Sequence, residues 1–419
     1  MRKRLLIYAH YYAPDVASTG QILQDLAEGM TDEFDVTVIC TVPSYTGTIA
    51  ETYRENRIYR EELNGVCVLR VPVPTFSKSD KKSRISNLLS YYQGAKRATK
   101  LVGTQDCVLT ISQPPIMGGM LGVYGKKKLG AKFIYCIQDF NPEQMIATGY
   151  IKMKPLLRAA MWIDKRSCRK SDLVVTVGRD LCETLEQRFR GYSAPRYVMI
   201  NNWIDEKKTV PLPADDPGVM SFRSEYGLDG KFVFMYSGNI GLYYDLEGLI
   251  RVMEKVQNIK TPDGREVIFA LVGAGSVLDR LKAYQRKHSM DNVMFIPYQE
   301  KEQLVYSLNA ADVHLCVNAK GIKGVSCPSK FYGIAAVGKP VLAVLEEGSE
   351  VRMLIDEIGC GKCAKPGDYD LIEENIRWFI EHAEQEILSE MGRRGREYLE
   401  KNLSKNMSIE KYMEAINAL

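Results

Sequence analysis

Short runs of β-branched and other apolar residues alternate with amphipathic, helix-like stretches along the whole chain. This alternation is typical of parallel sheets whose faces are covered by helices. In the first half the expected strands are 4–9, 35–40, 66–71, 107–111, 132–137, 173–177 and 197–200. In the second half they are 232–236, 267–272, 293–296, 313–317 and 340–344. The pattern predicts an α/β protein in which the same kind of sheet is built twice.

The length of the chain supports two domains. Its 419 residues exceed what one hydrophobic core usually serves, and two domains of about 200 residues each are the default expectation. Residues 205–217 are rich in Pro, Asp and Lys without an apolar period, and they are the expected linker. We expect two doubly wound, Rossmann-like domains, 1–204 and 218–395, facing across a cleft lined by the carboxyl ends of their strands. A long helical stretch begins near Ile387, and its last part, 396–419, is expected to pack back on the first domain.

The charge balance excludes one class of function. The chain has 56 Lys and Arg against 52 Asp and Glu, and a net charge of +4 is too small for a protein that neutralises many phosphates. No nucleic acid partner is therefore expected. No segment approaches the roughly 18 uninterrupted apolar residues that span a bilayer. The ten cysteines are scattered through apolar runs, as in proteins of a reducing compartment, and we expect a cytoplasmic protein.

Residue spacing does not favour metal or dinucleotide binding. Cys360 and Cys363 have the spacing of a zinc or redox pair, but no second pair or nearby His completes a site, and a strand start is the alternative. The four histidines have no metal-ligand spacing, and His314 lies in an apolar strand that suits the core. The loop 12–20 lacks the glycine pattern of a dinucleotide site. No metal site is expected.

Residues 324–340 combine a small-residue loop, a short helix and a glycine stop. Pro328 suits a first helical turn, Ser329 can cap the helix and Lys330 places a cation near the loop. Gly338 can end the helix in the left-handed conformation. A helix N-terminus with free N–H groups, a hydroxyl and a lysine suits a diphosphate. An ordinary capped helix that joins two strands is the alternative.

Two further glycine loops follow strands in the second half. Residues 236–241 read Tyr-Ser-Gly-Asn-Ile-Gly and lie between one strand and a helix expected to begin near Asp245. Residues 273–276 follow the next strand and have the same character. Glycines let the backbone approach a phosphate closely, although each loop alone is also explained as an ordinary turn. Three such loops in one domain favour a shared phosphate site.

A polar cluster follows the strand that ends at Ile137. Its members are two carboxylates and two amides, from Gln138, Asp139, Asn141 and Glu143. Such groups could bind sugar hydroxyls or act as a general base. Turn chemistry is the alternative, because Asn141-Pro142 is a common turn pair and Glu143 suits a first helical turn.

Taken together, these features resemble the GT-B glycosyltransferases of family 4, most closely their N-acetyl-L-fucosaminyltransferase (WbuB-like) branch, which builds bacterial surface polysaccharides. The resemblance covers nearly the whole chain. It rests on the loop 12–20, Gln138-Asp139, Pro142-Glu143, Asn202-Trp203-Ile204-Asp205, Gly238-Asn239-Ile240-Gly241, Gly273 with Gly275, Pro328-Ser329-Lys330-Phe331-Tyr332-Gly333 and Gly338-Lys339-Pro340.

The resemblance implies a retaining sugar transfer from a nucleotide-sugar donor, here a UDP-linked one, in capsule, O-antigen or exopolysaccharide biosynthesis. It implies neither a metal nor a covalently bound cofactor. The second domain would bind the donor, with Pro297 and Tyr298 near the nucleobase, and the first would bind the acceptor. The implied donor-binding residues are Gly20, Ser237, Gly238, Asn239, Gly241, Gly273, Gly275, Pro297, Tyr298, Val325, Ser326, Pro328, Ser329, Lys330 and Gly333. The implied catalytic residues are Gln138, Asp139, Glu143 and Lys330.

Two departures from the family pattern bear on these roles. Many members carry two glutamates eight residues apart, and those positions here read Val325 and Gly333. The frequent active-site His before the Asp is Gln138 here. The branch commonly lacks the glutamate pair, so the resemblance stands while the roles of the individual residues stay open.

Two basic stretches of the first half carry interleaved apolar residues. Residues 78–100 hold seven Lys or Arg against Asp80, and residues 149–170 hold seven against Asp164. Basic amphipathic stretches can lie on anionic membrane surfaces, although two ordinary half-buried helices are the alternative. Because both stretches fall in the expected acceptor domain, we expect peripheral association with the inner face of the cytoplasmic membrane. The expected acceptor is a saccharide linked to undecaprenyl diphosphate.

Two other functions remain open at this point. A sugar-nucleotide epimerase can have the same two-domain shape, although it usually needs several carboxylates and a His around the anomeric carbon. A non-catalytic protein that binds a sugar nucleotide or a lipid is conceivable, because the glutamate pair is missing.

Overall fold

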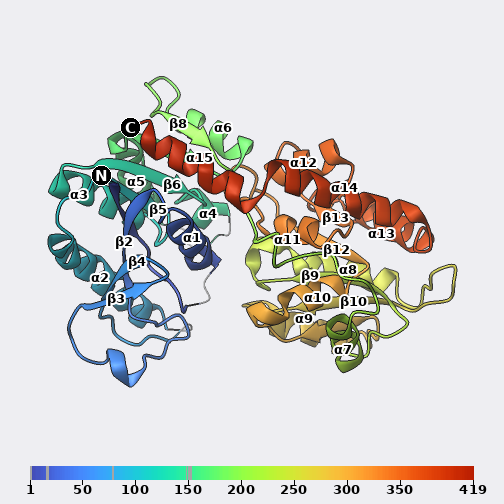
Figure 1. Ribbon diagram of the computed structural model, residues 1–419. Helices are drawn as coiled ribbons and strands as arrows, with labels where there is room; N and C mark the ends of the chain where they lie inside the picture. Colours follow the sequence, from blue (N-terminus) through green and yellow to red (C-terminus); the bar gives the residue numbers. More distant parts are fainter. Residues whose placement is uncertain (1, 16–17, 78–79, 148, 150–152) are drawn as a thin grey trace. The chain divides into compact units, whose positions relative to one another are not determined.

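The computed structural model describes residues 2–15, 18–77, 80–147, 149 and 153–419. Within these residues the chain divides into two compact units, each built on its own sheet (Figure 1). The first unit extends to Val177 and includes Leu181–Asn201 and Asn406–Leu419. The second consists of Gly178–Asp180 and Asn202–Lys405. The predicted α/β class with two sheet-based units is confirmed.

The sheet of the first unit has eight strands within the described residues. They are β1 (Lys3–Tyr8), β2 (Phe34–Thr41), β3 (Tyr59–Leu63), β4 (Val66–Val71), β5 (Cys107–Ile111), β6 (Lys132–Ile137), β7 (Leu173–Thr176) and β8 (Tyr197–Met199). Their order across the sheet is β3-β4-β2-β1-β5-β6-β7-β8. All neighbours pair in parallel except β3 and β4, which are antiparallel.

Strand β3 is absent from the sequence prediction. It reads Tyr-Arg-Glu-Glu-Leu and has no apolar run, and it lies at the edge of the sheet, where only one neighbour is needed. A signal for it was nevertheless present. Asn64 and Gly65 join β3 to β4 with φ values of 51° and 80°, and an Asn-Gly pair with two positive φ angles is the favoured two-residue hairpin turn.

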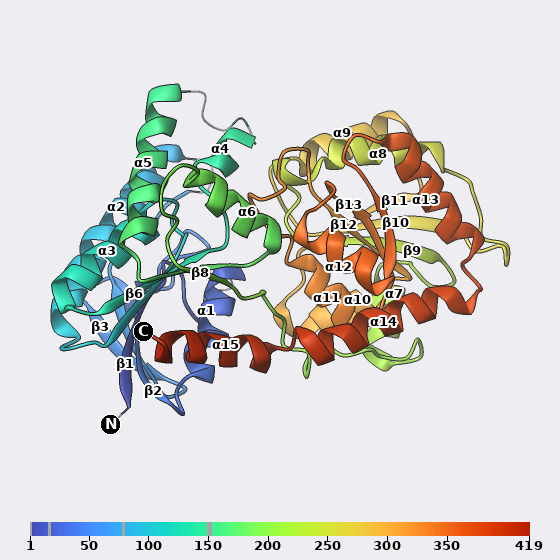
Figure 2. The same cartoon turned by 90° about the horizontal axis from the view of Figure 1, so that it is seen from above.

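Helices cover both faces of the first sheet. They are α1 (Ser18–Gly29), α2 (Lys81–Ala98), α3 (Met117–Leu129), α4 (Glu143–Ala147), α5 (Lys154–Lys170), α6 (Arg179–Arg188) and α15 (Lys405–Asn417). Figure 2 shows α2, α3 and α5 along one face and α1 with α15 on the other. Glycine allows the close packing of α3 on β6, because a Cβ on Gly122 would overlap the ring of Phe133.

The sheet of the second unit has six parallel strands within the described residues, in the order β11-β10-β9-β12-β13-β14. They are β9 (Phe232–Ser237), β10 (Val267–Val272), β11 (Val293–Ile296), β12 (Val313–Val317), β13 (Val341–Val344) and β14 (Gly361–Ala364). The first five agree with the sequence prediction to within one residue at either end. Cys360 and Cys363 lie at β14 as unpaired thiols, as the strand-start alternative expected.

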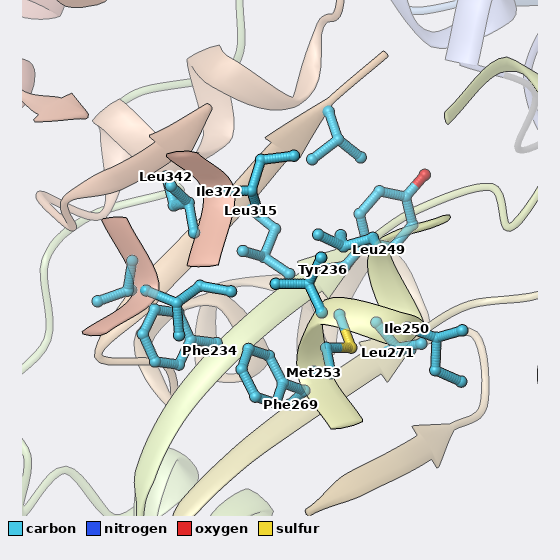
Figure 3. Close-up of a cluster of buried hydrophobic side chains, with 14 of the residues drawn as sticks. Phe234, Tyr236, Leu249, Ile250, Met253, Phe269, Leu271, Leu315, Leu342 and Ile372 are labelled. Carbon is cyan, nitrogen blue, oxygen red and sulfur yellow. The ribbon is translucent and has the colours of Figure 1, made fainter. Parts of the chain in front are cut away.

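The helices of the second unit are α7 (Pro217–Glu225), α8 (Leu246–Lys255), α9 (Leu278–Lys287), α10 (Leu304–Asn309), α11 (Lys330–Ala336), α12 (Glu350–Ile358), α13 (Tyr369–Glu381) and α14 (Glu386–Asn402). Figure 3 shows α8 packing the side chains of Leu249, Ile250 and Met253 toward the central strands. On these strands the rings of Phe234 and Phe269 stack with their centroids 5.0 Å apart. Each such side chain contributes about 1.5–3 kcal/mol when fully buried, so this cluster anchors the second sheet.

His314 belongs to the core, as its apolar strand predicts. Its ring is buried on β12, and its Nε2 lies 2.8 Å from the carbonyl oxygen of Leu308. Burial lowers the pKa of His314 to about 4. The side chain is therefore neutral at physiological pH and serves packing.

The expected single helical stretch at the chain end is wrong in one respect. Two helices, α14 and α15, form instead, with a break at Leu403 and Ser404. Only α15 packs on the first unit, where Ile409 meets Gly29 and Tyr412 is buried against Cys136. The returning segment is therefore shorter than the predicted 396–419, because α14 is held in the second unit by its own contacts.

The expected linker, 205–217, is bound along much of its length. The guanidinium of Arg396 on α14 donates to the carbonyl oxygens of Glu206 and Thr209 at 3.0 and 2.9 Å. The side-chain amide of Asn309 donates to the carbonyl oxygen of Val210 and accepts from the N–H of Leu212, both at 2.9 Å. Backbone hydrogen bonds therefore hold much of this segment in place.

None of the helices in the described part of the chain is both long and apolar enough to cross a membrane.

Two glycines on α14 give a matched test of this packing. A Cβ on Gly392 would overlap the backbone carbonyl of Gly338, whereas a Cβ on Gly395 would lie 3.4 Å from its nearest neighbour, an ordinary contact. Gly392→Ala should therefore lower the free energy of unfolding by about 2 kcal/mol or more. Gly395→Ala should leave it unchanged or raise it by up to about 1 kcal/mol, because Ala favours helix. Urea unfolding of both variants checks this, and equal stability would contradict the packing.

Candidate active site

The glycine loops of the second unit leave neighbouring strands at the same edge of the sheet. Their backbones pair directly, since the N–H of Gly238 donates to Val272 and that of Ile240 donates to Ala274, both at 2.9 Å. Gly238 and Gly273 have φ values of 140° and 137°, which favour glycine. A Cβ on Gly273 would overlap the carbonyl oxygen of Gly238. The two loops therefore form one surface that requires glycine.

Lys330 reaches this surface from α11. A Cβ on Gly238 would lie only 2.7 Å from the Cε atom of Lys330. The ammonium group lies 4.9 Å from the ring centroid of Tyr236 and 3.8 Å from that of Tyr244. A cation beside glycine backbone can hold an anion. The sequence patterns did not point to the two tyrosines, because a cation–π contact leaves no spacing signature.

Ser329 does not cap α11, and this expectation is wrong. Its backbone is helical, with φ −65° and ψ −14°, and its side chain makes no capping hydrogen bond. The hydroxyl is instead on an exposed residue beside Lys330. Gly338 does end the helix in the left-handed conformation, with φ 63°, as predicted. Pro328 was expected in the first helical turn, but it lies one residue before Ser329, outside the helix.

The two positions that replace the family's glutamates are occupied by buried, non-ionisable residues. Val325 is buried in the loop before α11. A Cβ on Gly333 would lie 3.5 Å from Ile204 and from Leu308, in ordinary apolar contact. Neither position offers a carboxylate, and Ser326 between Val325 and Pro328 is half-buried.

The remaining donor candidates are distributed as follows. Pro297 and Tyr298 follow β11, where the N–H of Gly273 donates to Ile296 at 2.9 Å, so they share the edge with the glycine loops. The residues 237, 239, 241 and 275 lie within the two glycine loops themselves. Gly20 lies in α1 of the first unit, where a Cβ would be 3.0 Å from the carbonyl oxygen of Tyr11. Val16 and Ala17, in the same predicted loop, lie outside the described residues.

Gln138 and Asp139 lie in the first unit, directly after β6. Their backbone N–H groups donate to the hydroxyl oxygen of Ser112 at 3.1 and 3.2 Å. The side-chain amide of Gln113 donates to a carboxylate oxygen of Asp139 at 3.4 Å. The polar turn after β6 is thus fixed by the turn after β5.

Arg188 holds the other end of this turn. Its guanidinium donates to Glu143 at 2.7 Å, to Asp164 at 2.6 Å and to the carbonyl oxygen of Asn141 at 2.9 Å. It also lies 4.2 Å from the ring centroid of Phe140. The Arg188 side chain is only 4% exposed. The carboxylate of Glu143 is thereby committed to an ion pair, a role that residue spacing could not reveal.

Asn141 belongs to the polar cluster that could bind sugar hydroxyls, with turn chemistry as the alternative, and its side chain is unusual. It is 2% exposed, and neither its amide nitrogen nor its amide oxygen has a hydrogen-bond partner among the described residues. A buried amide without partners costs free energy, which makes Asn141 an additional candidate for ligand contact beside Asp139.

In the described part of the chain, no group of three or more His, Cys, Asp or Glu side chains is arranged to hold a metal ion.

Two family profiles match the chain. The profile of the glycosyl transferase 4-like domain matches residues 19–203, and that of glycosyl transferases group 1 matches residues 221–398. A probable glycosyltransferase, WbjE of Pseudomonas aeruginosa, is 26% identical over 99% of this chain and 98% of its own. A putative colanic acid biosynthesis glycosyl transferase, WcaI of Escherichia coli K12, is 24% identical over 99% of both chains.

Solved structures share the fold at low sequence identity. Sucrose-phosphate synthase from Thermosynechococcus elongatus has a TM-score of 0.76 at 14% identity, covering 100% of this chain and 99% of its own. Anabaena Alr3699/HepE, solved in complex with UDP, has a TM-score of 0.70 at 14% identity over 100% of both chains. The matched domains, the full-length relatives and the shared fold agree that this chain is a GT-B glycosyltransferase, with a glycosyl transferase 4-like domain followed by a group 1 domain.

Proposed function

We propose that this glycosyltransferase transfers a sugar, with retention of configuration, from a UDP-sugar to a lipid-linked saccharide in the synthesis of a bacterial surface polysaccharide. The observation that carries the proposal is the ammonium group of Lys330 beside the glycine loop that begins at Gly238. That arrangement suits the diphosphate of a nucleotide sugar. The name of the relative WcaI, a putative colanic acid biosynthesis enzyme, supports the polysaccharide. Membership in the fucosaminyltransferase branch is part of the same proposal.

The donor chemistry follows from the charge that develops at the diphosphate. The bond between the anomeric carbon and the diphosphate oxygen breaks, and the bond to the acceptor hydroxyl oxygen forms on the same face. The hydroxyl proton passes to the departing diphosphate. Lys330 stabilises the negative charge that builds up on the leaving group, together with those N–H groups of the loop 238–241 that do not already donate to β10 and its loop, as Gly238 and Ile240 do. A fixed lysine and backbone amides supply this stabilisation without a metal ion.

UDP is the proposed nucleotide. HepE, which has the same fold, was solved in complex with UDP, and this supports a uridine nucleotide. Tyr298 follows β11 and is 53% exposed, and it is proposed to contact the base. Pro297 provides a rigid neighbour on the same loop.

The acceptor side is proposed to use Gln138 and Asp139 for positioning. Both are fixed by Ser112 through their backbone, and Asp139 also accepts from Gln113. Glu143 is proposed to anchor this turn through Arg188, because its carboxylate already accepts hydrogen bonds from the guanidinium.

The proposed acceptor is a saccharide linked to undecaprenyl diphosphate, reached by peripheral association with the inner face of the cytoplasmic membrane. The basic helices α2 and α5 of the first unit support this part of the proposal. Lys78 and Lys152, which contribute to the two basic stretches, lie outside the described residues.

An epimerase or a non-catalytic binding protein would behave differently. An epimerase converts the donor without any acceptor, and a binding protein neither hydrolyses nor transfers the sugar. Product analysis by mass spectrometry, with and without a lipid-linked saccharide, separates these functions. A new glycosidic product that forms only with acceptor supports the transferase.

Replacing Lys330 tests the donor site. Lys330→Ala should lower kcat/KM by at least about tenfold, because one preorganised charge at the leaving group is lost. Lys330→Arg should retain more activity than Lys330→Ala, since the positive charge stays. Exposed Lys301, on the same unit, provides a control that should remain active when changed to Ala. Circular dichroism verifies folding, and normal turnover by Lys330→Ala would contradict the assignment.

Thermal shift assays test the nucleotide. A ligand that binds only the folded chain raises its stability, by about 2.7 kcal/mol at a hundredfold excess over Kd. UDP should raise Tm by several degrees, and GDP, dTDP and ADP should raise it less. The shift with UDP should shrink in Lys330→Ala. A larger shift with GDP, dTDP or ADP would refute a UDP-linked donor.

Glu143→Gln separates an anchor from a general base. If Glu143 is an anchor, the Gln amide oxygen still accepts from Arg188, and kcat should fall by less than about tenfold. Loss of a general base lowers kcat by about 100-fold or more, which would contradict the anchor role. Arg188→Met should be far more damaging, because the buried Asp164 carboxylate loses its cationic partner and keeps only the hydrogen bond from Tyr135. Steady-state rates and urea unfolding of both variants provide the comparison.

A further inference from the structure

The basic residues of α5 have no acidic partner in the part of the chain that the structure describes, unlike those of α14. None of Lys154, Arg158, Lys165, Arg166, Arg169 and Lys170 forms an ion pair with any carboxylate of the described residues. The one acidic residue of this helix, Asp164, is buried and bound to Arg188 and Tyr135. The positive charge of α5 is therefore uncompensated at the surface.

Helix α14 provides the comparison. Arg393 pairs with Glu390 and Glu397, and Arg396 pairs with Glu400, at spacings of three or four residues. Such pairs neutralise a solvated helix face. Because α5 lacks them, its exposed surface is better suited to an anionic partner than to water alone.

Large apolar side chains are exposed beside these cations. Met153 is 65% exposed, Leu156 50% and Trp162 66% on or next to α5, and Ile146 of α4 is 53% exposed. Tyr192, in the segment after α6, is 70% exposed. Figure 2 shows the N-terminal half of α5 standing clear of the first sheet. Apolar and aromatic side chains of this kind are favoured where one side of a surface meets lipid.

The two kinds of side chain line one groove of about 790 Å³. Its apolar lining comes from Ile146, Leu157, Met161 and Trp162. Arg158, Lys165, Arg166, Arg169 and Lys170 supply its charge. Arg169 is held in place between two aromatic rings, 5.3 Å from the centroid of Phe189 and 5.3 Å from that of Tyr192. Phosphate groups above aliphatic chains match this combination of fixed cations and apolar surface.

We propose that the groove formed by α4, α5 and Tyr192 is the surface through which the first unit docks on an anionic phospholipid bilayer, with Trp162 entering the interfacial region. This deepens the membrane part of the proposed function by assigning it to one face. The other basic helix, α2, is the weaker choice. Its N-terminal cations lie beside Asp80, which caps the helix, and Lys96 packs on Tyr92 and Tyr124.

Charge reversal on the two helices gives a matched test. Arg158→Glu with Arg166→Glu changes exposed residues of α5, and Lys81→Glu with Lys82→Glu changes exposed residues of α2. Each exchange removes two charges, so both double variants lower the formal net charge from +4 to 0. Any difference between them therefore reports the place of the charge.

Co-sedimentation uses the full chain and vesicles of phosphatidylglycerol with phosphatidylethanolamine, or of phosphatidylcholine alone. The wild type should bind the anionic vesicles and leave the neutral ones. At low salt, where surface charges act most strongly, the fraction of the α5 variant bound to anionic vesicles should be at least about fivefold lower than that of the wild type. The α2 variant should bind nearly as the wild type. Equal recovery on neutral vesicles, or equal loss by both variants, would overturn the proposal.

Tryptophan fluorescence provides a second measurement. Of the three tryptophans, Trp203 is buried and Trp378 is partly buried, so a blue shift on vesicle binding reports Trp162. Trp162→Phe should abolish the shift. Soluble polyglutamate serves as a model of an acidic protein. If it displaces the chain fully from vesicles, and if the vesicles cause no blue shift of Trp162, the partner is an acidic protein and the lipid assignment is overturned.

The nucleotide assay separates this inference from the proposed function. Both double variants should keep the thermal shift with UDP, because their changes lie in the first unit. If the wild type shows the thermal shift with UDP but does not bind anionic vesicles, the docking surface is refuted and the donor assignment stands. Vesicle binding without any nucleotide shift would refute the donor assignment and leave the docking surface intact.

Discussion

Backbone contact between two glycine loops is the constraint on which the candidate donor site depends. Parallel strands β9 and β10 release their loops at one edge, and no side chain fits between Gly238 and Gly273. Because the loops meet backbone to backbone, their surface stays open to Lys330, whose cation rests on Tyr244. The apolar cluster beneath, around Phe234 and Phe269, keeps the two strands in register. Core packing thus sets the geometry of the polar site.

The charged side chains of the first unit are of two kinds: those bound to carboxylates inside the protein, and those at the surface without such a partner. Arg188 is buried and satisfied by two carboxylates and a carbonyl, so it acts as a structural clamp on the turn after β6. The cations of α5 lie at the surface without carboxylate partners in the described chain, and they are free to meet an external anion. Sequence composition counts both kinds equally. Burial and pairing distinguish them.

Prediction from sequence succeeded where periodicity is strong. The buried parallel strands of both units read as apolar runs, and their positions agree closely with the structure. It failed at β3, an edge strand without an apolar run, and at Ser329, whose backbone is already helical and whose hydroxyl does not cap. The break between α14 and α15 was also missed. No proline or glycine marks it, and the tertiary contacts of each helix decide where it ends.

The sequence by itself determined the fold class, the two sheets and the candidate loops at their carboxyl ends, because apolar periodicity and glycine positions are local properties of the chain. Only the tertiary structure decided which groups meet. It brought Lys330 to Tyr244, bound Glu143 to Arg188, and left the cations of α5 unpaired beside Trp162. These pairings join residues far apart in the chain, and their energies depend on distance and burial, which no local pattern records.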